Sequence, residues 1–117
     1  MTPDNLRPIP CAYDCTATGN QPVREFFKGL LAEERKIIGA DIVTIQFGWP
    51  LGMPLVNHLG AGLWEMRTRL PSRIVRTIFV VEGGEIVLLH SFLKKTRSTP
   101  IQELKLALRR KREIQKT

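Results

Sequence analysis

Apolar residues recur at helical spacing between positions 21 and 31 of the chain. The stripe consists of Val23, Phe26, Phe27, Leu30 and Leu31. Such a stripe predicts an amphipathic helix whose apolar face enters the core. Pro22 suits the first turn, and Glu25 is favourable near the positive N-terminal end. Residues 9–16 alternate loosely and predict a strand at a sheet edge, because Pro10 has no N–H for a ladder.

The following segment, residues 33–47, fits two patterns. Ile38, Ile42 and Ile45 have helical spacing, whereas the β-branched run 41–47 is typical of a strand. The charged opening at residues 33–36 favours a second helix that ends before Gly48. Residues 48–62 are rich in glycine and proline and predict a loop that crosses from the helices to a sheet.

Strict alternation begins at residue 63. Leu63, Glu65, Arg67 and Arg69 fall on one side of a predicted strand, and Trp64, Met66 and Thr68 fall on the other. The second, mostly apolar set is expected to contact the helices. The arginines should therefore face outwards or line a groove.

Two further strands are predicted, at residues 73–81 and 85–92. Gly83 and Gly84 lie between them and are a strong hairpin signal, since a type I′ turn needs positive φ at both central residues. The second of these strands is apolar on both faces, which predicts a central position in the sheet.

A last helix is predicted from residue 101. Thr99, Pro100 and Gln102 have the spacing of an N-cap, a first-turn proline and the glutamine of a capping box. One face of this helix carries Ile101, Leu104, Ala107 and Leu108. We expect the helix to lose definition in the basic run 109–112.

This order of elements predicts an α+β fold, with the helices segregated from a mostly antiparallel sheet. The 117 residues suffice for one domain over residues 1–117, with residues 1–8 a flexible lead-in. No segment approaches the roughly 18 apolar residues of a membrane span, and the N-terminus lacks a signal-peptide core. We therefore expect a cytoplasmic protein with no membrane partner. Cys11 and Cys15 are too few for a disulfide framework or a zinc site, and are expected to be buried thiols.

The formal net charge of +7 is concentrated at one end of the chain. Residues 94–117 hold nine Lys/Arg and two Asp/Glu, whereas the two charge types nearly balance before residue 94. Such a run can be a solvated helix face. An asymmetry this strong is more typical of a protein that binds a polyanion or an acidic protein.

The chemistry that these residues offer is cationic. If the predicted strands are neighbours, one sheet gathers Arg67, Arg69, Arg73, Arg76, Lys94 and Lys95. The two histidines, His58 and His90, form no metal-ligand cluster, and a satisfied core histidine is favoured for His90 over an acid/base role. Arginines and lysines hold a phosphodiester and stabilise its pentacovalent anion. That suffices for RNA cleavage without a metal, provided that the RNA is held in a reactive geometry.

Two stretches resemble motifs of a known superfamily. Residues 59–67 read Leu-Gly-Ala-Gly-Leu-Trp-Glu-Met-Arg, and residues 88–100 read Leu-Leu-His-Ser-Phe-Leu-Lys-Lys-Thr-Arg-Ser-Thr-Pro. With Arg76 between them, they resemble the RelE/ParE toxin superfamily of bacterial toxin–antitoxin modules, and most closely its HigB-like, phage-related branch. The helix at 23–31 and the segment after it fit the same order, so the resemblance spans roughly residues 9–113.

The resemblance implies a RelE-like fold and an mRNA interferase that cleaves messenger RNA in the ribosomal A site. It also implies silencing by a helix-turn-helix antitoxin, and no cofactor or metal is expected. By position, Arg67 and Arg76 match basic sheet residues that such toxins use on the scissile phosphate, and Lys94 and Lys95 match the basic pair after the last long strand. The further cations expected to bind RNA are Arg69, Arg73, Arg97, Arg109, Arg110 and Arg112.

Two other functions stay open at this point. One is a ParE-like toxin that binds and poisons DNA gyrase without catalysis. The other is an inactive phage-derived domain that binds RNA through its basic residues. Both have the same expected fold, so the fold alone does not separate them.

Overall fold

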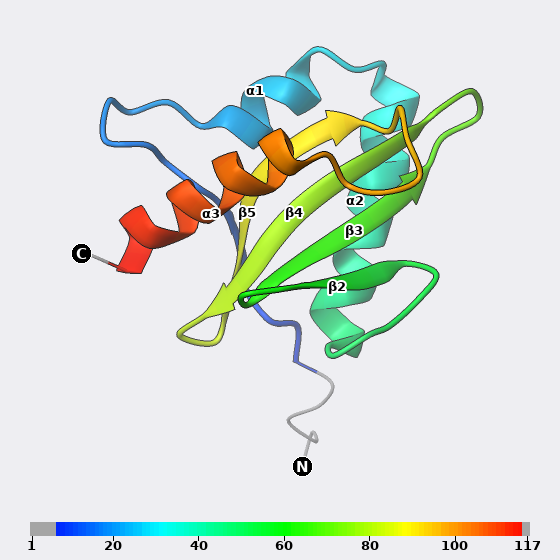
Figure 1. The fold of residues 1–117 in the computed structure, drawn as a ribbon. Helices are drawn as coiled ribbons and strands as arrows, with labels where there is room; N and C mark the ends of the chain where they lie inside the picture. The colour runs from blue at the N-terminus through cyan, green and yellow to red at the C-terminus, as the bar shows by residue number, and fades with distance from the viewer. Residues whose placement is uncertain (1–6, 116–117) are drawn as a thin grey trace.

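A computed structural model describes residues 7–115 and shows an α+β fold with three helices and a five-stranded sheet (Figure 1). The elements are β1 (Cys11–Tyr13), α1 (Pro22–Lys28), α2 (Ala32–Gly48), β2 (Val56–Gly60), β3 (Leu63–Arg69), β4 (Ile74–Glu82), β5 (Glu85–Leu93) and α3 (Ile101–Gln115). The predicted lead-in falls mostly on residues 1–6, which lie outside the described residues. Within residues 7–115, no helix combines the length and the apolar character needed to cross a membrane.

The strands lie in the order β1-β5-β4-β3-β2. β1 runs parallel to β5, and the other neighbours are antiparallel. The expectation of an edge strand near Pro10 is confirmed, and the Pro10 carbonyl accepts a hydrogen bond from the Ile86 amide. The expected central position of the strand at 85–92 is also confirmed, because β5 has a neighbour on each side.

Each face of the sheet packs against helices. On one face, Met66, Phe79 and Leu88 join the buried residues of α1 and α2 in one hydrophobic core. On the other face, Ile78 and Leu89 join a second core under α3, which includes Ala107. Figure 1 shows α3 in front of the sheet and α2 behind it. The sheet is therefore the middle layer of three, and α3 covers part of the face that carries the arginines.

The turns explain how the strands are joined. Gly83 and Gly84 have φ of 58° and 76°, so the predicted hairpin between β4 and β5 has positive φ at both central residues. The prediction of an unbroken loop from 48 to 62 is wrong, because Val56–Gly60 forms β2 and pairs with β3. Glycine and proline around this short, bulged strand hide it from a propensity argument, and pairing with β3 decides the outcome.

The helices differ from the predicted ones at their ends. α2 settles the ambiguity of residues 33–47 in favour of a helix, whereas α1 ends at Lys28 and leaves Leu31 68% exposed between the two. α3 continues through the basic run to Gln115, so the expected loss of definition at residue 109 is wrong. The Thr99 hydroxyl donates to Glu65, a contact across the fold that the predicted cap did not include.

Candidate functional site

The strand register brings the predicted cations to one end of the sheet. Arg67 on β3 is the partner of Arg76 on β4, which is also the partner of Phe92 on β5. Two residues further along β3, Arg69 is the partner of Ile74 at the start of β4. The Lys94 amide, just after β5, donates to the Ile74 carbonyl at 2.8 Å. Arg67, Arg69 and Arg76 lie on the same face of the sheet as Leu63 and Ile78, which pack in the core under α3. The expectation that these strands are neighbours is thus confirmed: Arg67, Arg69 and Arg76 lie on adjacent strands, and Lys94 directly follows β5.

A hollow of about 430 Å³ opens at this end of the sheet. It is lined by Arg69, Leu70, Ser72, Arg73, Ile74 and Lys94. Arg69 and Lys94 are exposed, and among the described residues neither forms an ion pair with a carboxylate. Lys95 and Arg97 follow in the exposed segment 94–98. Two positive charges without a carboxylate partner, Arg69 and Lys94, therefore line the opening, and this suits a phosphate group. Lys95 lines a separate hollow of about 230 Å³ with Phe92 and Glu103.

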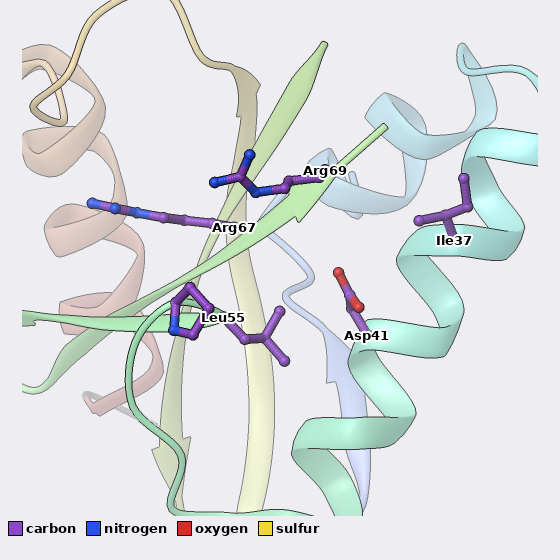
Figure 2. A pocket seen from close by; sticks show the side chains of 6 residues that line it. Ile37, Asp41, Leu55, Arg67 and Arg69 are labelled. Atoms are coloured by element: carbon purple, nitrogen blue, oxygen red, sulfur yellow. The ribbon is translucent and has the colours of Figure 1, made fainter. Parts of the chain in front are cut away.

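A second hollow, of about 230 Å³, lies where β2 stops pairing with β3. Figure 2 shows Asp41 and Ile37 on α2 facing it, with Leu55 below, while the guanidinium ends of Arg67 and Arg69 point away from Asp41. Burial raises the pKa of the Asp41 carboxyl. Arg67 and Arg69 also line this hollow, but their guanidinium groups are directed away from the only carboxyl group among its described lining residues, that of Asp41.

Arg73 is held by a buried carboxylate from α2. Its Nε donates to Glu34 Oε2 at 2.8 Å and its Nη2 donates to Glu34 Oε1 at 2.7 Å. These bonds, together with the Leu31 amide, hold the pKa of Glu34 below its usual range. Arg73 therefore lines the 430 Å³ hollow, but its positive charge is already paired with Glu34.

Arg76 is buried, with 1% of its surface exposed. The sequence predicted that Arg67, Arg76, Lys94 and Lys95 would all lie outside the core, and this prediction is wrong for Arg76. The segment 94–100 covers Arg76, whose Nη2 donates to the Arg97 carbonyl at 2.6 Å, while its Nε lies 3.7 Å from Glu65 Oε1. Its Nε and Nη1 have no hydrogen-bond acceptor among the described residues. Arg76 thus lies beneath the surface on which Arg69 and Lys94 are exposed.

Glu65 is fully buried and receives side chains from three directions. Its Oε1 accepts from Arg67 Nε at 3.1 Å and faces Arg76, and its Oε2 accepts from the Thr99 hydroxyl at 2.5 Å. Arg67 keeps 27% of its side chain exposed. No role was predicted for Glu65 from the sequence. The alternation of β3 was the available signal, because it placed Glu65 on the same side as Arg67.

The four cations of the basic run 109–112 in α3 fall into two groups. Arg110 donates to the Leu89 carbonyl at 2.7 Å and lies 3.2 Å from His90 Nδ1, and Lys111 donates to the Ala61 carbonyl. Arg109 and Arg112 are exposed on the outer face. Of the three arginines of this helix that were expected to bind RNA, Arg109 and Arg112 are therefore exposed, whereas Arg110 is engaged within the fold.

His90 agrees with the favoured interpretation of a satisfied histidine. Its Nε2 contacts Glu103 of α3, and its Nδ1 faces Arg110. A carboxylate and a guanidinium are satisfied together when the ring is neutral, with the proton on Nε2. Burial lowers the pKa of His90, against an opposing effect of Glu103. His90 therefore joins β5 to α3.

The cysteines and acidic residues provide little further chemistry. Cys11 is half-buried, and burial raises the pKa of its thiol to about 11, whereas Cys15 is exposed, so the expectation of two buried thiols is wrong for Cys15. In the described part of the chain, no three His, Cys, Asp or Glu residues are placed to hold a metal ion together.

Comparison with known protein families identifies the family of the chain. Residues 25–112 match the family described as Phage derived protein Gp49-like (DUF891). The chain belongs to this family. The Gp49-like family is part of the RelE/ParE-like toxin superfamily of toxin–antitoxin systems, which suggests a toxin that pairs with an antitoxin. No curated protein matches the chain. The match includes α2, the four strands β2–β5 and the segment that carries Lys94 and Lys95.

Proposed function

We propose that this Gp49-like protein is a HigB-like toxin that cleaves messenger RNA on the ribosome by metal-independent cationic catalysis. The observation that carries the proposal is the 430 Å³ hollow at the end of the sheet, with exposed Arg69 and Lys94 on its walls and Arg67 one row away. Such a hollow fits a phosphodiester, and the family supports a toxin.

In the proposed site, Arg67, Lys94 and Lys95 contact the scissile phosphate, and Arg69 holds a neighbouring phosphate. Arg97, Arg109 and Arg112 contribute exposed charge along the RNA backbone. Arg76 acts from beneath, because its guanidinium is buried and contributes a positive charge without touching solvent. Arg73 and Arg110 support the site through Glu34 and the Leu89 carbonyl.

The proposed reaction is a transesterification within the RNA. The ribose 2′-oxygen attacks the phosphorus, and the bond from phosphorus to the 5′-oxygen breaks. The 2′-hydroxyl loses its proton, and the leaving 5′-oxygen gains one. Cations beside the non-bridging oxygens stabilise the additional negative charge of the pentacovalent transition state, and the ribosome supplies the geometry of the RNA.

The test is to induce the chain in a bacterial host and map the ends of truncated transcripts. The proposal predicts 2′,3′-cyclic phosphate and 5′-hydroxyl ends, and cleavage by the purified protein in the presence of a chelator. Lys94→Ala/Lys95→Ala should reduce the cleavage rate by on the order of a hundredfold or more, since one transition-state cation contributes about 3 kcal/mol.

The matched control is Arg7→Ala/Lys36→Ala, which also removes two exposed positive charges but acts on the N-terminal segment and α2. The control should cleave at the wild-type rate. Broken or relaxed DNA with intact transcripts would instead indicate a gyrase poison. Wild-type cleavage by the folded Lys94/Lys95 variant would overturn the site, and loss of cleavage in the chelator would overturn the metal-independent mechanism.

A further inference from the structure

Glu65 lies at the centre of the cationic end of the sheet, and its burial requires an explanation. A carboxylate with no exposed surface loses the hydration that stabilises its charge, and only close partners compensate for that loss. Glu65 has three such partners, which come from β3, β4 and the segment before α3. It is therefore the point at which three separate parts of the site meet.

The contact with Arg67 fixes the direction of a half-exposed guanidinium. Glu65 and Arg67 are two residues apart on β3, so their side chains leave the same face. Glu65 accepts from Nε of Arg67, and no hydrogen bond within residues 7–115 uses its two Nη atoms. The two Nη groups are thus available to an external anion, in a direction that the carboxylate sets.

The contacts with Arg76 and Thr99 fix the segment that carries the lysines. Residues 94–98 are exposed, and Thr96 bonds only to Ser98 within the same segment. Besides the bond from the Lys94 amide to the Ile74 carbonyl, two side-chain bonds within residues 7–115 attach the segment to the sheet: Thr99 donates to Glu65, and Arg76 donates to the Arg97 carbonyl. Glu65 and Arg76 are neighbours in the buried cluster, so one cluster controls both Arg67 and the segment with Lys94 and Lys95.

A buried ion cluster is not needed merely to hold a loop on a sheet. Replacing buried ion pairs by packed apolar side chains is often neutral or stabilising. Here one carboxylate faces two guanidinium groups, Arg67 and Arg76, so the cluster keeps an excess positive charge directed to the surface through Arg67. This arrangement suits the binding of an anion.

From these contacts we infer that Glu65 is a positioning residue, which orients Arg67 and, through Thr99, holds Lys94 and Lys95 beside the same RNA phosphate. The inference rests on the proposed function. Glu65 itself does not touch the RNA. Thr99 is the second positioning residue, and its hydroxyl is the part that matters.

The experiment uses single-turnover cleavage of a ribosome-bound messenger RNA by Glu65→Gln, Thr99→Val and Thr99→Ser. Thr99→Val keeps the shape and loses the hydroxyl, so its cleavage rate at saturation should fall about tenfold with little change in KM, as for loss of a hydrogen bond to a charged group. Thr99→Ser should restore most of the rate. Glu65→Gln should lose more than Thr99→Val, because both arginines lose their anionic partner.

Trypsin provides a readout that does not depend on RNA. The exposed segment contains cleavage sites after Lys94, Lys95 and Arg97. Digestion at these sites should be several-fold faster in Glu65→Gln and Thr99→Val than in wild type, since cutting follows the opened population. Thr96→Val is the matched control: it removes a hydrogen bond inside the segment and should change neither digestion nor RNA cleavage.

The outcomes separate the two proposals. A wild-type protein that cleaves no RNA overturns the proposed function and the positioning role on RNA with it. An active wild type with equally active, folded Thr99→Val and Glu65→Gln variants overturns only the role of Glu65. Activity that falls in proportion to the unfolded fraction measured by circular dichroism, with no rescue by Thr99→Ser, would also overturn it.

Discussion

The end of the sheet and the outer face of α3 both carry many cations, but they hold them differently. At the sheet end, Arg67, Arg73 and Arg76 all face buried carboxylates, so their positions are fixed by the fold. On α3, Arg109 and Arg112 are exposed, and neither forms an ion pair with a carboxylate among the described residues. Fixed charges around a hollow suit the geometry of one phosphate, whereas a spread of exposed charges suits the backbone of a polyanion.

This difference changes what the net charge means. The last 24 residues carry the whole formal charge of +7, yet Arg110 and Lys111 are engaged by Leu89, His90 and Ala61. Conversely, residues 1–93 are neutral overall and still contribute Arg69 to the sheet end, beside Lys94. Charge per segment therefore identifies a polyanion-binding surface less well than the set of cations that have no internal partner.

The largest expected effect concerns the buried charges of the sheet end. Arg76→Met should lower the free energy of unfolding by about 3 kcal/mol or more, because Glu65 loses the buried one of its two cationic partners. Chemical denaturation measures this change. Arg69→Met, the same substitution at an exposed position one row away, should change stability by less than about 0.5 kcal/mol. Equal effects of the two substitutions would remove the distinction between fixed and exposed cations.

A second variant tests the cause of that loss. In the double variant Glu65→Gln/Arg76→Met, a neutral amide replaces the carboxylate and needs no cationic partner. The double variant should therefore be more stable than Arg76→Met alone. If it is less stable by the sum of both changes, Arg76 contributes through packing and not through the charge of Glu65.

The order of elements and much of the sheet followed from the pattern of apolar residues. Alternation placed Glu65, Arg67 and Arg69 on one face of β3, and the Gly83–Gly84 pair located the hairpin, because both signals are local. β2 was missed since its pairing with β3 is a tertiary interaction. The parallel contact of β1 with β5 joins residues far apart in the chain, and no local pattern encodes it.

The site was predicted only in part, for a related reason. The cations and their convergence could be inferred from strand order, but burial depends on what covers a residue. Arg76 is buried because segment 94–100 crosses β4, and Arg73 is neutralised because the start of α2 brings Glu34 to it. Both partners lie more than twenty residues away in the chain. Sequence reasoning therefore found the charges and missed the carboxylates that hold them.

The next largest effect is expected for RNA binding by the exposed arginines of α3. Arg109→Glu/Arg112→Glu should weaken RNA or ribosome association broadly and reduce the salt dependence of log K by about two units if both contact phosphates. Binding measured across a salt series checks this. Arg110→Glu should instead destabilise the fold, since Arg110 bonds to the Leu89 carbonyl. Unchanged affinity and salt dependence in the first variant would make the outer face of α3 an ordinary solvated helix.

A smaller effect, on the stability of the fold at acid pH, is expected for Arg73, which is also held by a buried carboxylate. Arg73 holds the pKa of Glu34 below its ordinary value of 4.5, so the folded state releases this proton more readily than the unfolded chain. The resulting stabilisation is present above about pH 4.5 and is lost as the pH falls through the folded value. Arg73→Gln should flatten this part of the pH dependence of unfolding. The same acid slope in both proteins would mean that Arg73 does not set it.

The smallest expected effect concerns His90 at the junction of β5 and α3. Burial lowers the pKa of His90 from its ordinary 6.5, while Glu103 opposes the change and Arg110 adds to it. The unfolded chain therefore binds this proton more readily, and the stabilisation is complete above about pH 6.5 and is lost as the pH falls through the folded value. A proton on Nδ1 would also face the guanidinium of Arg110, which donates to that nitrogen when the ring is neutral.

Thermal unfolding of wild type and His90→Gln between pH 7 and about pH 5 measures the effect of His90 on stability. The wild-type midpoint should decline more with acidification than that of His90→Gln, which has no titrating ring. A wild-type midpoint that instead rises in this range would show that Glu103 dominates and that the folded protein prefers the charged imidazolium.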